Sequence, residues 1–181
     1  MLEFLPVSPE RGGDLERFSS RHGKFRYCSC MRWRMTSAEF KASDKEARVA
    51  ALAALAEDGE PVGVLAYDDG EPVGWCAVAP REGFRGLERY RALARVDETP
   101  VWSVVCLFVD ASARRQGLTT GLLRAAARYA VAAGAGVVEG YPVEPDARLY
   151  TYMGSPAAFA AAGFHDVTPP GRERRVFRYV P

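Results

Sequence analysis

The strongest constraint on the fold is a strand, a helix and a second strand that follow one another in the second half of the chain. Residues 99–109 (TPVWSVVCLFV) are β-branched, aromatic and nearly uncharged, which is typical of a central strand. Residues 117–133 are dense in Ala and Leu and predict a helix, which Gly134 and Gly136 end before a strand at 137–141. Strands joined by a crossover helix pair in parallel, so the chain contains a βαβ unit.

Shorter strands surround this unit. The hexapeptide DGEPVG occurs at residues 58–63 and again at 69–74, and it marks two turns that bracket a strand. That strand is expected to form an antiparallel hairpin with the strand that follows the second turn. The strands expected outside the central unit lie at residues 2–7, 64–67, 73–79, 164–167 and 174–180. Together these segments predict an α+β fold with a mixed, mostly antiparallel sheet of about seven strands, one of whose strand pairs is parallel.

About three to four helices are expected to flank the sheet. Outside the central unit they lie at residues 13–21, 43–57 and 155–162. The second of them has the clearest signal, because Ser43 can serve as its N-cap and Glu46 follows three residues later, as a capping box requires. Residues 24–35 (KFRYCSCMRWRM) are aromatic, basic and hard to classify.

The composition excludes several classes of protein. A length of 181 residues fits one domain, and a net charge of +1 argues against non-specific nucleic-acid binding, which neutralises many phosphates. No apolar run reaches about 18 residues, so no membrane-spanning helix is expected. The N-terminus does not resemble a signal peptide. We therefore expect a cytoplasmic protein with reduced cysteines and with no membrane or nucleic-acid partner.

The loop between the central strand and its helix has the features of an anion site. Backbone N–H groups at a helix N-terminus bind anions, and Arg114 and Arg115 add positive charge beside them. Neither GxGxxG nor GxxxxGK[ST] is present, which disfavours a dinucleotide fold and a nucleoside triphosphatase. A strand, a glycine-containing loop and a helix also arise from topology alone in many α/β proteins.

The order of residues in this loop, VDASARRQGLT, resembles the pyrophosphate-binding motif of the GCN5-related N-acetyltransferase (GNAT) family. That motif reads Arg or Gln, two residues, Gly, one residue, then Gly or Ala, and Arg114, Gly117 and Thr119 fall on its three positions. A second motif, FAAAGF at residues 159–164, is similar to the helix end Tyr-x-x-x-Gly-Phe of the same family. The resemblance covers residues 62–180, and the N-terminal part matches in outline.

The resemblance implies a single GNAT domain over residues 1–181, in which residues 1–60 cap the acceptor site and residues 62–180 form the acetyl-CoA-binding core. It implies acetyl-CoA as co-substrate, no metal, and direct attack by a primary amine of a small molecule. A backbone N–H near the end of the central strand would polarise the thioester carbonyl. The residues implied in acetyl-CoA binding are Phe108, Val109, Arg114, Arg115, Gln116, Gly117, Leu118, Thr119, Thr120 and Phe159.

Two residues depart from the family pattern. Thr119 replaces the last small residue of the loop, so the backbone there must keep a negative φ, and the hydroxyls of Thr119 and Thr120 can donate to a phosphate. Phe159 stands where the family has a tyrosine that often protonates the leaving thiolate. Since an alkyl thiol has a pKa of about 8.5, losing this acid slows the reaction by roughly 10²- to 10³-fold without preventing it. Ser155 and Tyr152, with Tyr150, are candidate replacements.

The acceptor amine also needs a base, because an alkylammonium has a pKa of about 10.4. Glu98, just before the central strand, and Glu139, in the neighbouring strand, are the candidates, although Glu139 can equally be a strand residue paired with arginine. The acceptor pocket is expected among aromatic and charged residues. These are residues 27–33, Trp75, 81–84, Trp102 and 141–144, of which the two strand tryptophans are also core candidates.

Several alternatives remain at this point. Cys28 and Cys30 form a C-x-C that could be half of a zinc site, but Cys76 and Cys106 are isolated on separate strands. The Phe159 substitution favours a non-catalytic CoA-binding regulatory or interaction module. A protein N-acetyltransferase and a transferase of longer acyl chains also fit. The C-terminal strand is an edge that could form a homodimer.

Overall fold

The computed structural model describes residues 1–28, 30–114 and 116–181. Its centre is a seven-stranded sheet with the strand order β1-β2-β3-β4-β5-β7-β6. All neighbouring strands are antiparallel except β4 and β5, which are parallel. The strands are β1 (Leu2–Pro6), β2 (Gly63–Asp68), β3 (Glu71–Pro80), β4 (Trp102–Val109), β5 (Val138–Gly140), β6 (His165–Asp166) and β7 (Phe177–Tyr179). The predicted mixed sheet with one parallel pair is confirmed.

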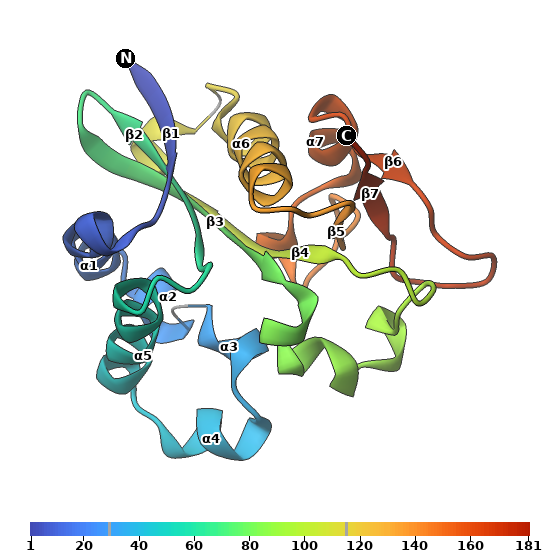
Figure 1. Ribbon diagram of the computed structural model, residues 1–181, viewed down its shortest axis with the longest axis horizontal. Helices are drawn as coiled ribbons and strands as arrows, with labels where there is room; N and C mark the ends of the chain where they lie inside the picture. The colour runs from blue at the N-terminus through green and yellow to red at the C-terminus, as the bar shows by residue number, and fades with distance from the viewer. Residues whose placement is uncertain (29, 115) are drawn as a thin grey trace.

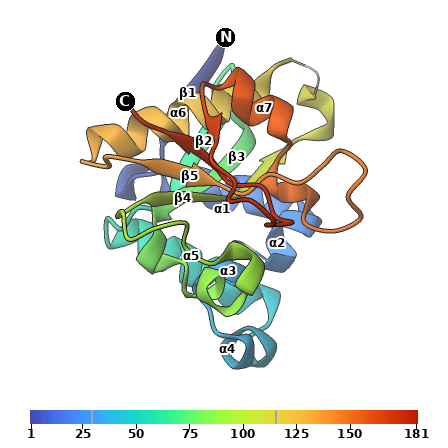
Figure 2. The same cartoon turned by 90° about the vertical axis from the view of Figure 1, so that its right-hand side faces the viewer.

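Helices cover both faces of this sheet (Figures 1 and 2). The α-helices of the described residues are α1 (Gly12–Arg21), α2 (Gly23–Cys28), α3 (Met31–Arg34), α4 (Ser37–Ala42), α5 (Lys45–Glu57), α6 (Leu118–Ala132) and α7 (Pro156–Ala161). Side chains alternate along each strand, so Val64 packs in the core beneath α6 whereas Leu65 packs in the core beneath the N-terminal helices. Within the described ranges, no helix is both long and apolar enough to cross a bilayer.

The start of α5 differs from the prediction. Asp44 is its N-cap, with the side chain accepting from the Ala47 N–H at 2.7 Å, so the predicted cap at Ser43 and capping box at Glu46 are wrong. The reason is the preceding helix α4, which was not predicted. Ser43 is already the C-cap of α4, where its N–H donates to the carbonyl of Glu39, and this shifts the next helix along by one residue.

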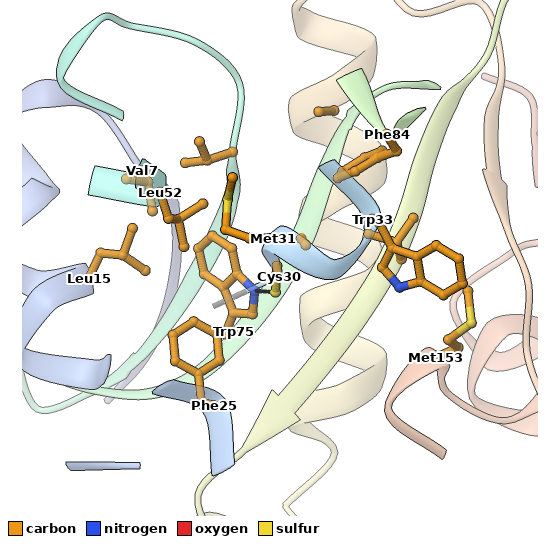
Figure 3. Packing of buried hydrophobic residues seen from close by; sticks show 14 of the residues in the cluster. Val7, Leu15, Phe25, Cys30, Met31, Trp33, Leu52, Trp75, Phe84 and Met153 are labelled. Atoms are coloured by element: carbon orange, nitrogen blue, oxygen red, sulfur yellow. Dashed lines mark hydrogen bonds between the residues drawn. The ribbon is translucent and has the colours of Figure 1, made fainter. Parts of the chain in front are cut away.

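The unclassified segment at residues 24–35 folds into the short helices α2 and α3 and inserts aromatic side chains beside the sheet. Figure 3 shows the indole Nε1 of Trp75, on β3, donating to the sulfur of Cys30 at 3.0 Å, with Phe25 beside the same indole. Trp33, from α3, packs near Met153 on the other side of Met31. Trp33 is fully buried, as is Trp75 on β3 against which the segment packs. This segment therefore forms part of the core.

The sheet opens between β4 and β5. Their parallel pairing covers only three residue pairs and ends at Val104 opposite Gly140. The ring of Phe159, from α7, lies against the end of β5, where a β-carbon on Gly140 would be 2.1 Å from its Cε1 atom. Beyond Val104, β4 pairs only with β3 among the described residues, so one edge of its last five residues is open.

This contact gives a stability prediction. Gly140→Ala should lower the free energy of unfolding by about 1–3 kcal/mol, because the buried Phe159 ring occupies the space a methyl group needs. Gly136→Ala is the matched control, since nothing lies within 4 Å of its β-carbon position and its φ is not positive. It should change stability by less than about 1 kcal/mol. Urea denaturation of both variants checks this, and equal stabilities would contradict the close packing at the end of β5.

Candidate active site

A cavity of about 900 Å³ lies along the open edge of β4. Its walls come from β4, from the loop and first turn of α6, from helices α2 to α4, and from the short 3-10 helix η6 (Thr151–Met153). The lining residues are Lys24, Phe25, Cys28, Cys30, Arg32, Trp33, Phe40, Cys106, Leu107, Phe108, Val109, Ala113, Arg114, Gly117, Leu118, Thr119, Thr120, Thr151, Tyr152 and Gly154. The predicted loop and strand end therefore line one cavity with part of the N-terminal segment.

The loop before α6 is shaped by Asp110 and Gly117. The carboxylate of Asp110 accepts from the backbone N–H of Ser112 at 2.9 Å and caps a single 3-10 turn. Gly117 has a φ of 75° and precedes the first helical residue, and a β-carbon there would meet nothing within 4 Å. Backbone conformation, and not lack of space, therefore requires glycine at this position. Arg115, an expected member of the site, lies outside the described residues.

The first turn of α6 presents donors to the cavity. Gly121 is bonded through its N–H to the carbonyl of Gly117 at 3.0 Å, so the N–H groups of Leu118, Thr119 and Thr120 precede the helix's own hydrogen bonds. Such groups, with the helix dipole, favour an anion. Thr119 keeps the negative φ that its branched side chain was expected to need. Both threonine side chains are half-buried at the cavity wall.

Other expected members of the phosphate site are placed differently. Arg114 and Leu118 both line the cavity. Arg114 is exposed, whereas Leu118 is buried. Gln116 is exposed and is not among the lining residues. Phe159 is fully buried in the core between the rings of Phe164 and Phe177 and is also outside the lining.

The open edge of β4 supplies backbone donors of its own. The N–H of Asp110 donates to the carbonyl of Val73 on β3 at 2.8 Å. Because backbone groups alternate sides along a strand, the N–H groups of Val109 and Leu107 point to the open edge, whereas that of Phe108 faces β3. Near the end of β4, the N–H of Val109 is therefore available at the open edge, whereas that of Phe108 is not. Phe108 contributes its side chain to the cavity wall instead.

Of the candidate acids, the structure brings Tyr152 to the cavity. Burial raises the pKa of Tyr152, so its hydroxyl stays protonated. The hydroxyl of Ser155 instead accepts from the N–H of Ala158 at 3.3 Å as the N-cap of α7. Ser155 is not among the lining residues, and it serves the predicted helix cap.

Neither candidate base lines the cavity. Glu98 is exposed in the loop before β4. Glu139 is only 1% exposed, and its carboxylate accepts from Arg178 Nε at 2.7 Å and from the Tyr141 hydroxyl at 2.8 Å, with Arg81 at 3.6 Å. This arrangement corresponds to the arginine-paired reading of Glu139. No carboxylate is found in the lining, as far as the described residues show.

Three of the cysteines line the cavity, which the sequence did not indicate for Cys106. Burial, with the neighbouring Cys30, raises the pKa of the Cys28 thiol to about 11. A hydrogen bond with Cys30, followed by burial, raises the pKa of Cys106 well above its usual value. Since the thiolate is the nucleophile, the raised pKa values make Cys28 and Cys106 poor nucleophiles near neutral pH. In the described part of the chain, no group of His, Cys, Asp or Glu is arranged to hold a metal ion.

The end of the cavity away from α6 is aromatic and basic. Arg32 and Trp33 line it, as two members of the acceptor set expected from residues 27–33. Trp75, Arg81, Trp102 and Tyr141, also expected there, do not. Sequence reasoning missed Phe40 and Thr151. The capping box Thr36-x-x-Glu39 at the start of α4 was a signal that could have found the helix of Phe40, whereas η6 has no such signature and reaches the cavity through tertiary packing.

Comparisons with known proteins agree with this geometry. The sequence matches the acetyltransferase (GNAT) family over residues 28–154. No curated protein matches it. Similar folds include a Drosophila melanogaster polyamine N-acetyltransferase, at 16% identity, TM-score 0.60 and full coverage of both chains. A ribosomal-protein-alanine N-acetyltransferase from Brucella melitensis has 18% identity, TM-score 0.56 and 99% coverage of both chains.

A third similar structure is a PaiA N-acetyltransferase from Thermoplasma acidophilum in complex with coenzyme A. It has 11% identity and a TM-score of 0.55, and the match covers 100% of this chain and 99% of that one. At these identities the likeness shows the fold alone. The same fold therefore occurs in proteins named for small amine acceptors and for protein acceptors.

The placement of Glu139 can be tested by its removal. Glu139→Gln should lower the free energy of unfolding by about 1.5–3 kcal/mol, because it removes the buried negative charge that Arg81 and Arg178 share. Glu88 and Asp97 still pair with these arginines. Glu98→Gln, at an exposed site, should change stability by less than about 0.5 kcal/mol. Thermal and urea denaturation check both variants. A stable Glu139→Gln protein in which the plateau of the pH profile moves from near neutral pH up to the acceptor's own pKa would instead identify Glu139 as a base.

Proposed function

Because the chain belongs to the acetyltransferase (GNAT) family, we propose that it transfers the acetyl group of acetyl-CoA to a primary amine of a small molecule. The observation that carries this proposal is the single cavity that joins the N-terminus of α6, the open edge of β4 and an aromatic end built by the N-terminal helices. The N-terminus of α6 can hold the pyrophosphate of acetyl-CoA and the edge of β4 can hold its thioester. The aromatic end leaves room for an acceptor.

Each part of the cavity has a role in the reaction. The N–H groups of Leu118 to Thr120, with Arg114, bind the pyrophosphate. The N–H of Val109 donates to the thioester oxygen and stabilises the negative charge that develops there. The amine nitrogen attacks the thioester carbon, the C–S bond breaks, the amine proton goes to solvent, and the thiolate takes a proton from Tyr152 or from water.

A small acceptor is favoured by the enclosure of the aromatic end. Trp33 and Phe40 are buried in its wall, and η6 lies along β4 on the other side. An extended peptide needs an open groove with unpaired backbone groups, whereas these walls present aromatic faces. A flat or apolar molecule with one amine fits such a lining better.

A second candidate function is a non-catalytic CoA-binding module. Phe159 in place of the usual tyrosine and the carboxylate-free lining of the described residues favour it. Both functions require acetyl-CoA to bind at α6, and only the first requires acetyl transfer. Binding and turnover are therefore measured separately in the two predictions that follow.

Acetyl-CoA binding tests the phosphate site. Gly117→Asp should abolish calorimetrically detected binding, because it places a carboxylate where the pyrophosphate sits and strains a φ of 75°. Gly171→Asp is the matched control, since Gly171 has a φ of 78°, has nothing within 4 Å and lies in an exposed loop outside the cavity. It should bind acetyl-CoA as the unaltered protein does. Loss of binding in both variants, or in neither, would contradict the site.

The pH dependence of transfer tests the absence of a carboxylate base. At saturating acetyl-CoA, kcat/KM for the acceptor should rise tenfold per pH unit and level off at the acceptor's own pKa, which is about 10 for an alkylamine. An acceptor of lower pKa should move the plateau down by the same amount. A plateau that begins near neutral pH for every acceptor would reveal a base on the protein and overturn this assignment.

A further inference from the structure

The acceptor end of the cavity contains a guanidinium that is not paired with a carboxylate. Arg32, on α3, is half-buried and lines the cavity. Its side chain donates to the hydroxyl of Tyr90 at 2.8 Å and lies 5.7 Å from the centre of the Phe40 ring. These contacts use one of the five N–H donors of the guanidinium. Among the described residues, Arg32 takes part in no ion pair.

The described groups around Arg32 add hydrogen-bond donors, and none of them is a carboxylate. Burial raises the pKa of Tyr152, and the positive charge of Arg32 opposes that shift, which places the two side chains within electrostatic reach. Arg174 lies 4.7 Å above the ring of the adjacent Tyr150, and burial lowers its pKa. The buried indole N–H of Trp33 has no hydrogen-bond partner in the described part of the molecule. Among the described residues that line this end, Arg32 supplies positive charge and no carboxylate is present.

Aromatic rings form this part of the wall and pack against it: Trp33 and Tyr152 line the cavity, and the rings of Tyr90 and Tyr150 contact them from outside the lining. The Trp33 ring meets that of Tyr90 edge-on at 5.5 Å and that of Tyr150 at 6.2 Å, and the rings of Tyr150 and Tyr152 are 6.1 Å apart. Rings in such tilted and edge-on arrangements pack well against another flat group. The wall therefore suits a planar or apolar body that carries an anion directed at Arg32.

We propose that the acceptor is an amine that also bears a carboxylate on a flat or apolar body, and that Arg32 binds this carboxylate. This inference rests on the proposed function. A guanidinium presents paired N–H groups that match the two oxygens of a carboxylate. The same charge repels cationic acceptors, since like charges in a partly desolvated site cost binding energy. This chain should therefore discriminate against polyamines and agmatine, which similar structures are named for.

Matched acceptors test the charge preference. The probes are L-phenylalanine, its amide, and agmatine, each with acetyl-CoA and with the acetylated product detected by mass spectrometry. We expect kcat/KM for phenylalanine to exceed that for the amide by roughly tenfold or more, as for a hydrogen-bonded charge pair. Agmatine should be the poorest of the three. The amine of the amide has a lower pKa than the amine of phenylalanine, so more of it is free base at a given pH. This difference favours the amide and therefore works against the expected result.

Variants assign the preference to Arg32. Arg32→Gln should reduce the ratio of phenylalanine to amide to within about twofold, and Arg32→Lys should retain part of it. Arg128→Gln makes the same chemical change at an exposed position on α6 outside the cavity and should keep the full ratio. The melting temperatures of all three variants show whether a changed ratio comes from the lost charge or from unfolding of the protein. A ratio unchanged in Arg32→Gln would overturn the assignment.

A binding measurement separates this inference from the proposed function. 3-Phenylpropionate has the ring and the carboxylate but no amine, and it should bind the CoA-loaded protein roughly tenfold or more tightly than 3-phenylpropanamide in calorimetry. Acetyl transfer to agmatine or the amide with equal or greater efficiency would overturn the acceptor class and leave the proposed function standing. The opposite outcome is a protein that binds acetyl-CoA and prefers 3-phenylpropionate but acetylates no amine. That result would overturn the proposed acetyl transfer and leave the carboxylate site at Arg32 standing.

Discussion

The ring of Phe159 against Gly140 is the contact on which the site depends. It fills the space at the end of β5, where the parallel pairing with β4 stops after three residue pairs. The last residues of β4 then keep one edge free, and the first turn of α6 lies at the end of that edge (Figure 1). An open sheet edge presents unpaired N–H and C=O groups to which another group can bind. Here the cavity runs along that edge.

Several features of the fold and site were predictable because they depend on local sequence. The run of β-branched and aromatic residues, Gly117 and the Ala-rich helix specify a strand, a loop and a helix within one short stretch. The negative φ at Thr119 follows from its branched side chain, and it was predicted and found. The position of Ser155 as N-cap of α7 also follows from local rules.

Other features were set by tertiary contacts that no local pattern contains. Ser43 caps the end of an unpredicted helix, so the cap of α5 moved to Asp44. The charged Glu139 in an apolar strand was consistent with a base or with an ion pair, and its pairing with Arg81 and Arg178, which are distant in sequence, could not be read from local pattern. The end of the cavity away from α6 combines α3 and α4, from the N-terminal part of the chain, with η6 from the second half, and these meet only through tertiary packing.

The most direct test of the central claim, that acetyl-CoA binds along the open edge of β4 and the first turn of α6, is amide hydrogen exchange followed by NMR. Saturation with acetyl-CoA should slow exchange at the N–H groups of Val109, Thr119 and Thr120. The N–H of Phe108, which faces β3, should be unaffected. Exchange that is unchanged at Val109, or slowed equally at Val109 and Phe108, would contradict the binding of acetyl-CoA at this edge.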